Sequence, residues 1–236
     1  MGEVNCEGRT SREVNAEIKR QVRQGENPIV VCNPGARHNL GVAILQPVTV
    51  QIHGSVGYYC AGLIDGATVE VAGSAGWGLA ESMMNGLVRV RGSAGNGAAA
   101  AIRAGTVVIQ GDAAARLGIS MKGGAVIVAG NCGYMAGFMA QKGTLVVGGD
   151  AGEAFGDSMY ETVCYVGGKI ASLGTDAVIE KPSSGEAESL DALLAQHLDP
   201  DARRKLPRGA DFKKIVAGRK LWNFDKREWK TWQEAL

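Results

Sequence analysis

The chain has 236 residues, of which 45% are hydrophobic, and its formal net charge is +1. This length suffices for one sizeable domain or for a domain with appendages. The near-neutral charge argues against a nucleic-acid partner, and because no signal-peptide core and no run of about 18 apolar residues is present, we expect a cytoplasmic protein with no membrane attachment.

Cysteine and histidine are too dispersed to suggest a metal site. The five cysteines, which include no Cys-x-x-Cys pair, are Cys6, Cys32, Cys60, Cys132 and Cys164, and the three histidines are His38, His53 and His197. An odd, scattered set favours a reducing compartment and argues against an iron–sulfur cluster or zinc site made by this chain alone. We therefore expect no cofactor or metal in this chain.

Residues 1–46 are predicted to hold a helix and a first partial coil. Thr10 and Glu13 have the spacing of a capping box, an apolar residue recurs every fourth position from Val14, and Gly25 closes the pattern. A helix with one apolar stripe must dock on something, and we expect it to cap the end of the structure that follows.

A short strand, Ile29–Cys32, leads into a polar turn, Asn33–Asn39. Two interpretations of this turn stay open. Arg37 and His38 either bind an anion or a partner carboxylate, or they belong to a turn whose Asn side chains satisfy backbone groups.

Residues 47–179 are organised around a repeat. Seven marker glycines follow one another at a constant interval of 19 residues: Gly54, Gly73, Gly92, Gly111, Gly130, Gly149 and Gly168. Apolar residues stand two and four positions before each marker, so each unit holds a strand with one buried face. Small residues follow three and seven positions after it, where the glycines permit tight turns and positive φ.

The internal shape of the repeat predicts an all-β protein, a parallel β-helix of about seven coils with one coil per 19 residues. A leucine-rich repeat would need a Leu-x-x-Leu-x-Leu frame, a propeller blade would need about 40 residues, and a hexapeptide helix would need a sixfold sub-period. None of these patterns is present.

Three positions before the marker, an outward column changes character along the chain. The first three units have Gln51, Glu70 and Arg89, and the next four have Val108, Ile127, Val146 and Tyr165. Stacked apolar residues on an outer face imply a cover, either the C-terminal tail or another subunit. Glu70 beside Arg89 is more simply an exposed cross-strand pair than a catalytic dyad.

The corners of the repeat carry two further features. One position after the marker stands a ladder of mostly short polar residues, Ser55, Ser74, Ser93, Asp112, Asn131, Asp150 and Lys169, which we interpret as turn hydrogen bonding rather than cation binding. Large side chains interrupt other corners at Tyr58, Tyr59, Trp77, Tyr134 and Phe138. These are either local plugs or partner contacts, and we favour contacts.

Residues 180–236 leave the period and are predicted to form a partly helical tail. Leu190, Leu193, Leu194 and Leu198 indicate a short amphipathic helix after Ser189, and Asp199-Pro200 begins another turn. The last segment is basic and contains Trp222, Trp229 and Trp232, so we expect it to pack on the rod or on a partner.

Three long runs carry a resemblance to a known family. They are GISMKGG (residues 118–124), GYMAGFMAQKG (133–143) and GEAFGDSMYE (152–161), and the resemblance extends over roughly residues 10–180. Together they resemble the C-terminal Gly-x-Gly-x-Gly domain of the glutamate synthase large subunit. In that family the domain is a right-handed β-helix that braces a glutaminase domain against an FMN and iron–sulfur synthase domain.

A domain that stands alone most resembles the middle subunit of three-part glutamate-synthase-like enzymes, N-methylglutamate synthase above all. The resemblance implies a non-catalytic scaffold in a higher-order hetero-oligomer, whose partners are a class II amidotransferase-like subunit and a subunit that carries FMN and iron–sulfur clusters. The chain itself offers no catalytic cysteine at its start, since Cys6 lies too far in.

Three alternatives stay open. The first is the corresponding subunit of a glutamate synthase proper, and the second is a subunit of a formylmethanofuran dehydrogenase or a formyltransferase/hydrolase complex. The third is an autonomous polysaccharide lyase or hydrolase, which would need stacked carboxylates or basic residues in a groove.

Overall fold

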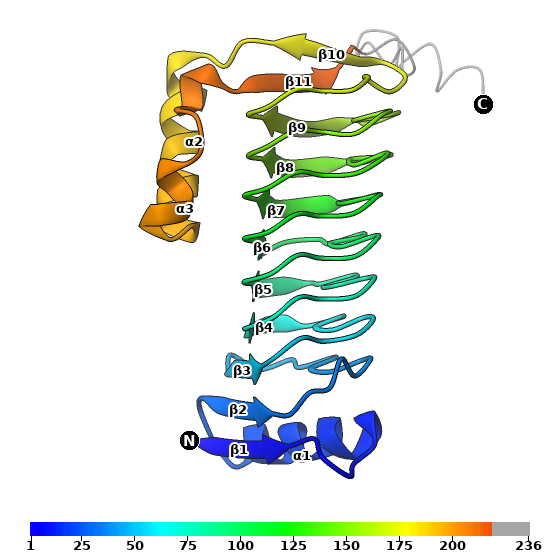
Figure 1. Ribbon diagram of the computed structural model, residues 1–236, viewed down its shortest axis with the longest axis vertical. Helices are drawn as coiled ribbons and strands as arrows, with labels where there is room; N and C mark the ends of the chain where they lie inside the picture. The colour runs from blue at the N-terminus through cyan, green and yellow to red at the C-terminus, as the bar shows by residue number, and fades with distance from the viewer. Residues whose placement is uncertain (219–236) are drawn as a thin grey trace, which may run out of the picture.

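The computed structural model describes residues 1–218, which form a rod of stacked β-coils with a helical tail along one side (Figure 1). The predicted parallel β-helix of about seven coils is confirmed. Strands β1 to β9 lie side by side in chain order and are parallel throughout. They are β1 (Gly2–Asn5), β2 (Ile29–Cys32), β3 (Thr49–His53), β4 (Asp65–Val71), β5 (Asn85–Val90), β6 (Thr106–Ile109), β7 (Lys122–Val128), β8 (Lys142–Val147) and β9 (Glu161–Val166).

The apolar columns of the repeat form the core of the rod. Val71, Val90, Ile109, Val128 and Val147 are register partners from strand to strand, and each is at most 1% exposed. Each such side chain contributes about 1.5–3 kcal/mol by leaving water. The period of the sequence therefore sets the register of the stack.

The marker glycines are needed for close approach between coils rather than for positive φ. A Cβ on Gly111 would lie 2.9 Å from both the carbonyl carbon and oxygen of Gly92. Among the seven markers, which all lie in the described residues, only Gly54 has a positive φ. The backbones of successive corners touch, and any side chain at these positions would push the coils apart.

The left-handed backbone conformation occurs at other corner positions, and some of these positions hold alanine or serine. In one coil φ is +66° at Gly78, +57° at Ala80 and +55° at Ser82, and the same offsets recur along the rod. Their amides donate alternately to the next coil and to the preceding one, with N···O distances of 2.8–2.9 Å to Asn96, Cys60 and Ala100. These hydrogen bonds between coils offset a left-handed conformation that costs a non-glycine residue about 1–2 kcal/mol.

At the N-terminal end, α1 (Ser11–Arg23) lies beside β1 and β2 (Figure 1). The predicted capping box of Thr10 and Glu13 is present, and Val14 and Ile18 are fully buried against the first coil. Strand β1, which we did not predict, forms the edge of the sheet. The side-chain Nε2 of Gln21 donates to the carbonyl of Glu3 at 3.0 Å, so the helix also satisfies part of that open edge.

The C-terminal end closes the stack with antiparallel strands. Strand β11 (Lys213–Ala217) inserts between β9 and β10 (Ala177–Glu180) and is antiparallel to both. Strand β11 was not predicted, because it lies outside the repeat. Lys214 fixes the arrangement by pairing with Glu180 at 3.2 Å and with Glu186 at 2.7 Å.

The helical tail is longer than predicted. Helix α2 (Ser184–His197) begins well before Leu190, because Ser183 and Glu186 form a second, unpredicted capping box. It is followed by α3 (Pro200–Arg204), which has the proline in its first turn, and by the 3-10 helix η1 (Gly209–Asp211). The tail then returns to the end of the rod as β11.

The tail covers the apolar outer face. Val108, Ile127 and Val146 are fully buried and Tyr165 is 7% exposed. They form one cluster with residues of the tail: Leu190, Leu194, Leu198 and Phe212. The predicted cover was either the C-terminal tail or another subunit, and in the structure it is the chain's own tail.

Candidate interaction surface

A column of stacked rings runs along one corner of the rod. The rings of His38 and Tyr58 lie 4.4 Å apart and 15° from parallel, and those of Tyr58 and Trp77 lie 5.2 Å apart and 19° from parallel. Tyr58 is 40% exposed and Trp77 is 53% exposed. The column therefore presents aromatic surface to solvent on successive coils.

Glycines beneath the rings make this stacking possible. A Cβ on Gly76 would lie 2.7 Å from Tyr58 Cδ1, and a Cβ on Gly95 would lie 2.6 Å from Trp77 Cδ1. Each ring thus occupies the space above a glycine of the next coil, three positions after its marker. Ala114 stands at that position after Asn96, which carries no ring.

An open groove follows the last of these rings. We call it the aromatic groove, and its volume is about 510 Å³. It is lined by Tyr59, Trp77, Gly78, Glu81, Asn96, Gly97, Ala100, Ala115, Arg116, Ile119 and Tyr134. Trp77 and Tyr134 hold equivalent positions three coils apart, and between them stand Asn96 and Ala115. The groove is therefore a gap of two coils in the ring column, with aromatic side chains at both ends.

The groove has opposite charges at its two ends. Glu81 and the ring of Tyr59 both lie against Gly78, near the Trp77 end, whereas Arg116 stands in the coil before Tyr134. A second hollow of about 350 Å³ lies on the other side of Tyr59, which is 48% exposed. Tyr59, Trp77 and Tyr134 are thus placed where a partner can reach them.

Arg37, His38 and Phe138, which were also predicted as contact residues, do not line the aromatic groove. Arg37 is half-buried, and its Nη2 donates to the carbonyl of Cys6 at 2.6 Å, so it links the turn to the residue that follows β1. His38 Nδ1 accepts the amide of Tyr58 at 2.8 Å, which leaves its proton on Nε2. Phe138 is half-buried. Trp222, Trp229 and Trp232 lie outside the described residues.

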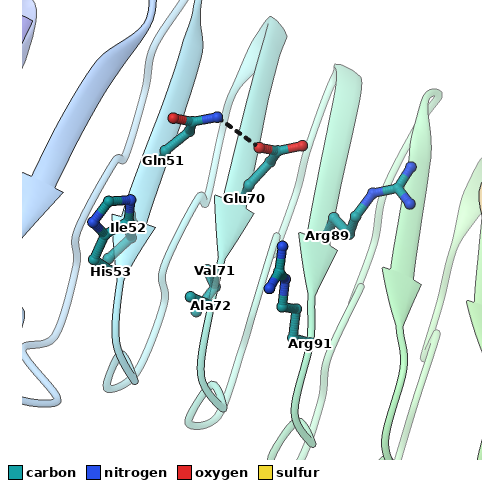
Figure 2. Close-up of a pocket in the computed structure, with 8 residues that line it drawn as sticks. All are labelled: Gln51, Ile52, His53, Glu70, Val71, Ala72, Arg89 and Arg91. Carbon is teal, nitrogen blue, oxygen red and sulfur yellow. Dashed lines mark hydrogen bonds between the residues drawn. The ribbon is translucent and has the colours of Figure 1, made fainter. Parts of the chain in front are cut away.

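Beyond the end of α2, the outer face bears a polar hollow of about 220 Å³ (Figure 2). Gln51 donates to Glu70 at 3.2 Å, whereas Arg89 points away from Glu70 and donates to the carbonyl of His197 at 2.8 Å. Arg89 thus stabilises the C-terminal end of α2. Glu70 and Arg89 are register partners on neighbouring strands, as predicted, but no ion pair joins their side chains. Glu70 is the sole carboxylate in this lining, so the hollow lacks the paired carboxylates of a glycoside hydrolase.

The polar ladder at the corners is a chain of hydrogen bonds. The amides of Ser74, Ser93, Asp112, Asn131, Asp150 and Lys169 each donate to the side chain of the preceding rung, at 2.6–3.2 Å. Turn hydrogen bonding, which the sequence predicted, is confirmed. Over residues 1–218 no group of three or more His, Cys, Asp or Glu side chains is arranged to hold a metal ion.

Three thiols of the coils, those of Cys60, Cys132 and Cys164, are buried and neutral. Burial raises the pKa of Cys60 and of Cys132 to about 12, and it also raises the pKa of Cys164. A thiol must ionise to act as a nucleophile. At neutral pH these side chains therefore pack as small apolar groups.

Replacing Cys132 by alanine is expected to make the stability less sensitive to alkali. The folded-state pKa of this thiol is raised, so between about pH 9 and pH 12 the unfolded chain loses a proton that the folded chain keeps. Stability then falls as pH rises, by up to about 1.4 kcal/mol per pH unit for one thiol. Alanine fits, because the same column holds Ala75, Ala94, Ala113 and Ala151.

Urea unfolding of both proteins at pH 7 and pH 10 checks this prediction. The loss of stability between the two pH values should be smaller in Cys132→Ala than in the parent. Equal losses would show that the thiol ionises as readily in the folded rod as in the unfolded chain.

These features define a parallel β-solenoid protein, braced by its own tail, with an aromatic groove on one corner. The chain is similar to Protein GlxC of Rhizobium meliloti (strain 1021), with 46% identity over 57 residues. That match covers 23% of this chain and 25% of GlxC, so it spans only about a quarter of either protein. No family model matches the chain. Among residues 1–218, the structure has no helix with the length and apolar character needed to cross a bilayer.

Proposed function

We propose that the chain is a non-catalytic scaffold subunit of a glutamate-synthase-like complex, and specifically of N-methylglutamate synthase. In this role it braces an amidotransferase-type subunit against a subunit that carries FMN and iron–sulfur clusters. The complex would convert methylamine and glutamate into N-methylglutamate and ammonia. The long runs at residues 118–124, 133–143 and 152–161 and the similarity to GlxC support a glutamate-synthase-related role.

One observation carries the scaffold role. The coils form an unbroken stack, and their side chains serve to hold the rod together. Four of the five thiols are buried, the polar ladder is hydrogen-bonded, and Arg37 and Arg89 donate to carbonyls of the chain itself. What the rod offers to solvent is rigid surface, above all the aromatic groove. A rigid strut suits the positioning of two active sites in partner subunits.

Affinity purification of the tagged chain from its source organism tests the proposal. We expect two larger subunits to copurify in fixed ratio, together with FMN and iron, and we expect the preparation to form N-methylglutamate. The purified chain alone should show no turnover, and turnover by the isolated chain would reject the scaffold role.

The same preparation separates the alternatives. Glutamine-dependent glutamate formation would indicate a glutamate synthase proper. Molybdenum or tungsten, or formyltransferase subunits, would indicate a formylmethanofuran-type complex. An unrelated protein with the same tag is the control for adventitious binding.

A further inference from the structure

Two large apolar residues, Tyr59 and Leu63, stand at strained backbone positions and face solvent. Their φ angles are +57° and +58°, and their side chains are 48% and 54% exposed. A left-handed conformation costs a non-glycine residue about 1–2 kcal/mol. At the position of Leu63, nine after the marker, three other coils have Ser82, Ser120 and Ser158. The coil therefore does not need a leucine there, and the exposed apolar pair indicates contact with another molecule.

Tyr59 separates two hollows on the same corner of the rod. On one side lies the aromatic groove, and on the other lies the second hollow, whose volume is about 350 Å³. The second hollow is lined by Asn39, Val42, Tyr59, Gly62, Leu63, Glu81 and Ser82. Glu81 lines both hollows and is half-buried, and within residues 1–218 its carboxylate forms no ion pair. This carboxylate thus lies between two largely apolar hollows.

We propose that the two hollows bind one extended segment of a partner subunit, which carries an apolar, a basic and an aromatic side chain in this order, counted from the α1 end of the rod. The inference rests on the proposed function, in which partner subunits bind the rod. The apolar side chain would contact Val42 and Leu63 in the second hollow, and the basic one would pair with Glu81. The aromatic side chain would lie in the aromatic groove between Trp77 and Tyr134.

The surroundings of Glu81 favour a basic group, and an arginine above all. A Cβ built on Gly78 would lie 2.6 Å from Tyr59 Cδ1 and 3.1 Å from Glu81 Oε2, so the ring and the carboxylate are neighbours. Because a guanidinium group is planar, it can donate to the carboxylate and stack on the ring at once. An ion pair held between two apolar anchors is also screened less by salt than a fully exposed pair.

The length of the two hollows favours a peptide over a small molecule. Asn39 at one end and Tyr134 at the other end are about five coils apart, which is roughly 24 Å at 4.8 Å per coil. About seven residues of extended chain span that distance. Between these ends the lining includes small residues, at Gly78, Gly97 and Ala100, which leave room for such a segment.

Release of each partner subunit from the immobilised, tagged complex tests the proposal. We expect Leu63→Ser and Tyr59→Ala each to release one of the two subunits at least about tenfold faster than the parent does, and to leave the other subunit unaffected. Both variants should fold, since Ser82 and Ala154 occupy the equivalent positions of other coils with φ of +55° and +53°. Met139→Ser is the matched control, because it removes an apolar side chain at the position of Leu63 four coils away, outside both hollows.

Glu81→Gln separates the ion pair from the packing contacts. It keeps the size of the side chain and removes its charge, so we expect faster release at low salt and a smaller acceleration by added salt than in the parent. A release rate that depends on salt as strongly as it does in the parent would overturn the proposed ion pair.

The outcomes distinguish this inference from the proposed function. A parent that copurifies with no subunit would overturn both, whereas variants that release both subunits at the parent's rates would overturn this inference alone. Two results on the isolated chain would also overturn it. A concentration-dependent dimer that Leu63→Ser abolishes would assign the hollows to a second copy, and a Tm lowered by Leu63→Ser and Tyr59→Ala without faster release would show that the chain itself covers them.

Discussion

Replacing Gly111 by alanine is expected to lower the free energy of unfolding by about 1–3 kcal/mol, the usual cost of forcing an extra group into a packed site. The new Cβ would lie 2.9 Å from the carbonyl carbon and oxygen of Gly92 and 2.6 Å from Ser93 Oγ. The serine side chain can rotate, but the Gly92 backbone belongs to the neighbouring coil and must shift. A chain of this size would lose roughly 2–4 °C of Tm per kcal/mol.

Gly185→Ala is the matched control, because nothing lies within 4 Å of a Cβ built at Gly185 in α2. Alanine there should raise stability by about 0.5–1 kcal/mol through its helix propensity. Urea unfolding followed by far-UV circular dichroism measures both variants. A Gly111→Ala protein as stable as the parent would show that the coils can separate locally without loss.

The buried face of the rod could be predicted because it depends on a strict spacing. Apolar residues two and four positions before each marker predicted the strands, and every coil repeated the pattern. Positive φ was expected for the glycines seven positions after the markers, and Gly118, Gly137 and Gly156 have it. The left-handed positions that hold other residues could not be found in the same way. Ala80 and Ser82 give no sign of positive φ, since inter-coil hydrogen bonds rather than residue type hold them there.

Single elements outside the repeat were harder to predict. Strand β11 is a short apolar run with no copy elsewhere in the chain, and only its place between β9 and β10 makes it a strand. The start of α2 was available in the sequence, because Ser183 and Glu186 have the capping-box spacing. The leucine spacing predicted only the second half of the helix, because the first turn contains no leucine.

The surface residues were found from the sequence, but the groove was not. Tyr58, Tyr59 and Tyr134 were identified as bulky interruptions of small-residue corners, each judged alone. The groove is defined by what lies between the rings, at Asn96 and Ala115. Comparing the column four positions after the marker would have revealed both the rings and the missing ones.

Replacing Leu194 by aspartate is expected to detach the tail from the rod. Leu194 is fully buried in the cluster that α2 forms with the outer face of the later coils. The substitution removes a leucine contact worth about 2–5 kcal/mol and places an unpaired charge among apolar side chains, which adds a further penalty. Because the docked tail shields Val108, Ile127 and Val146 from water, its release would expose a continuous apolar strip, and the protein should aggregate and bind a hydrophobic dye.

Gln196→Asp places the same charge on the exposed side of the same helix, and it should leave the tail docked. Limited proteolysis distinguishes the two variants, since release of α2 should open the linker at residues 181–183 to cleavage in Leu194→Asp alone. Partial resistance is also informative, because β11 stays hydrogen-bonded between β9 and β10 and can hold the end of the tail after α2 has left. Equal cleavage rates and equal dye binding in both variants would mean that β11 and the Lys214 ion pairs, rather than the leucine contacts of α2, hold the tail in place.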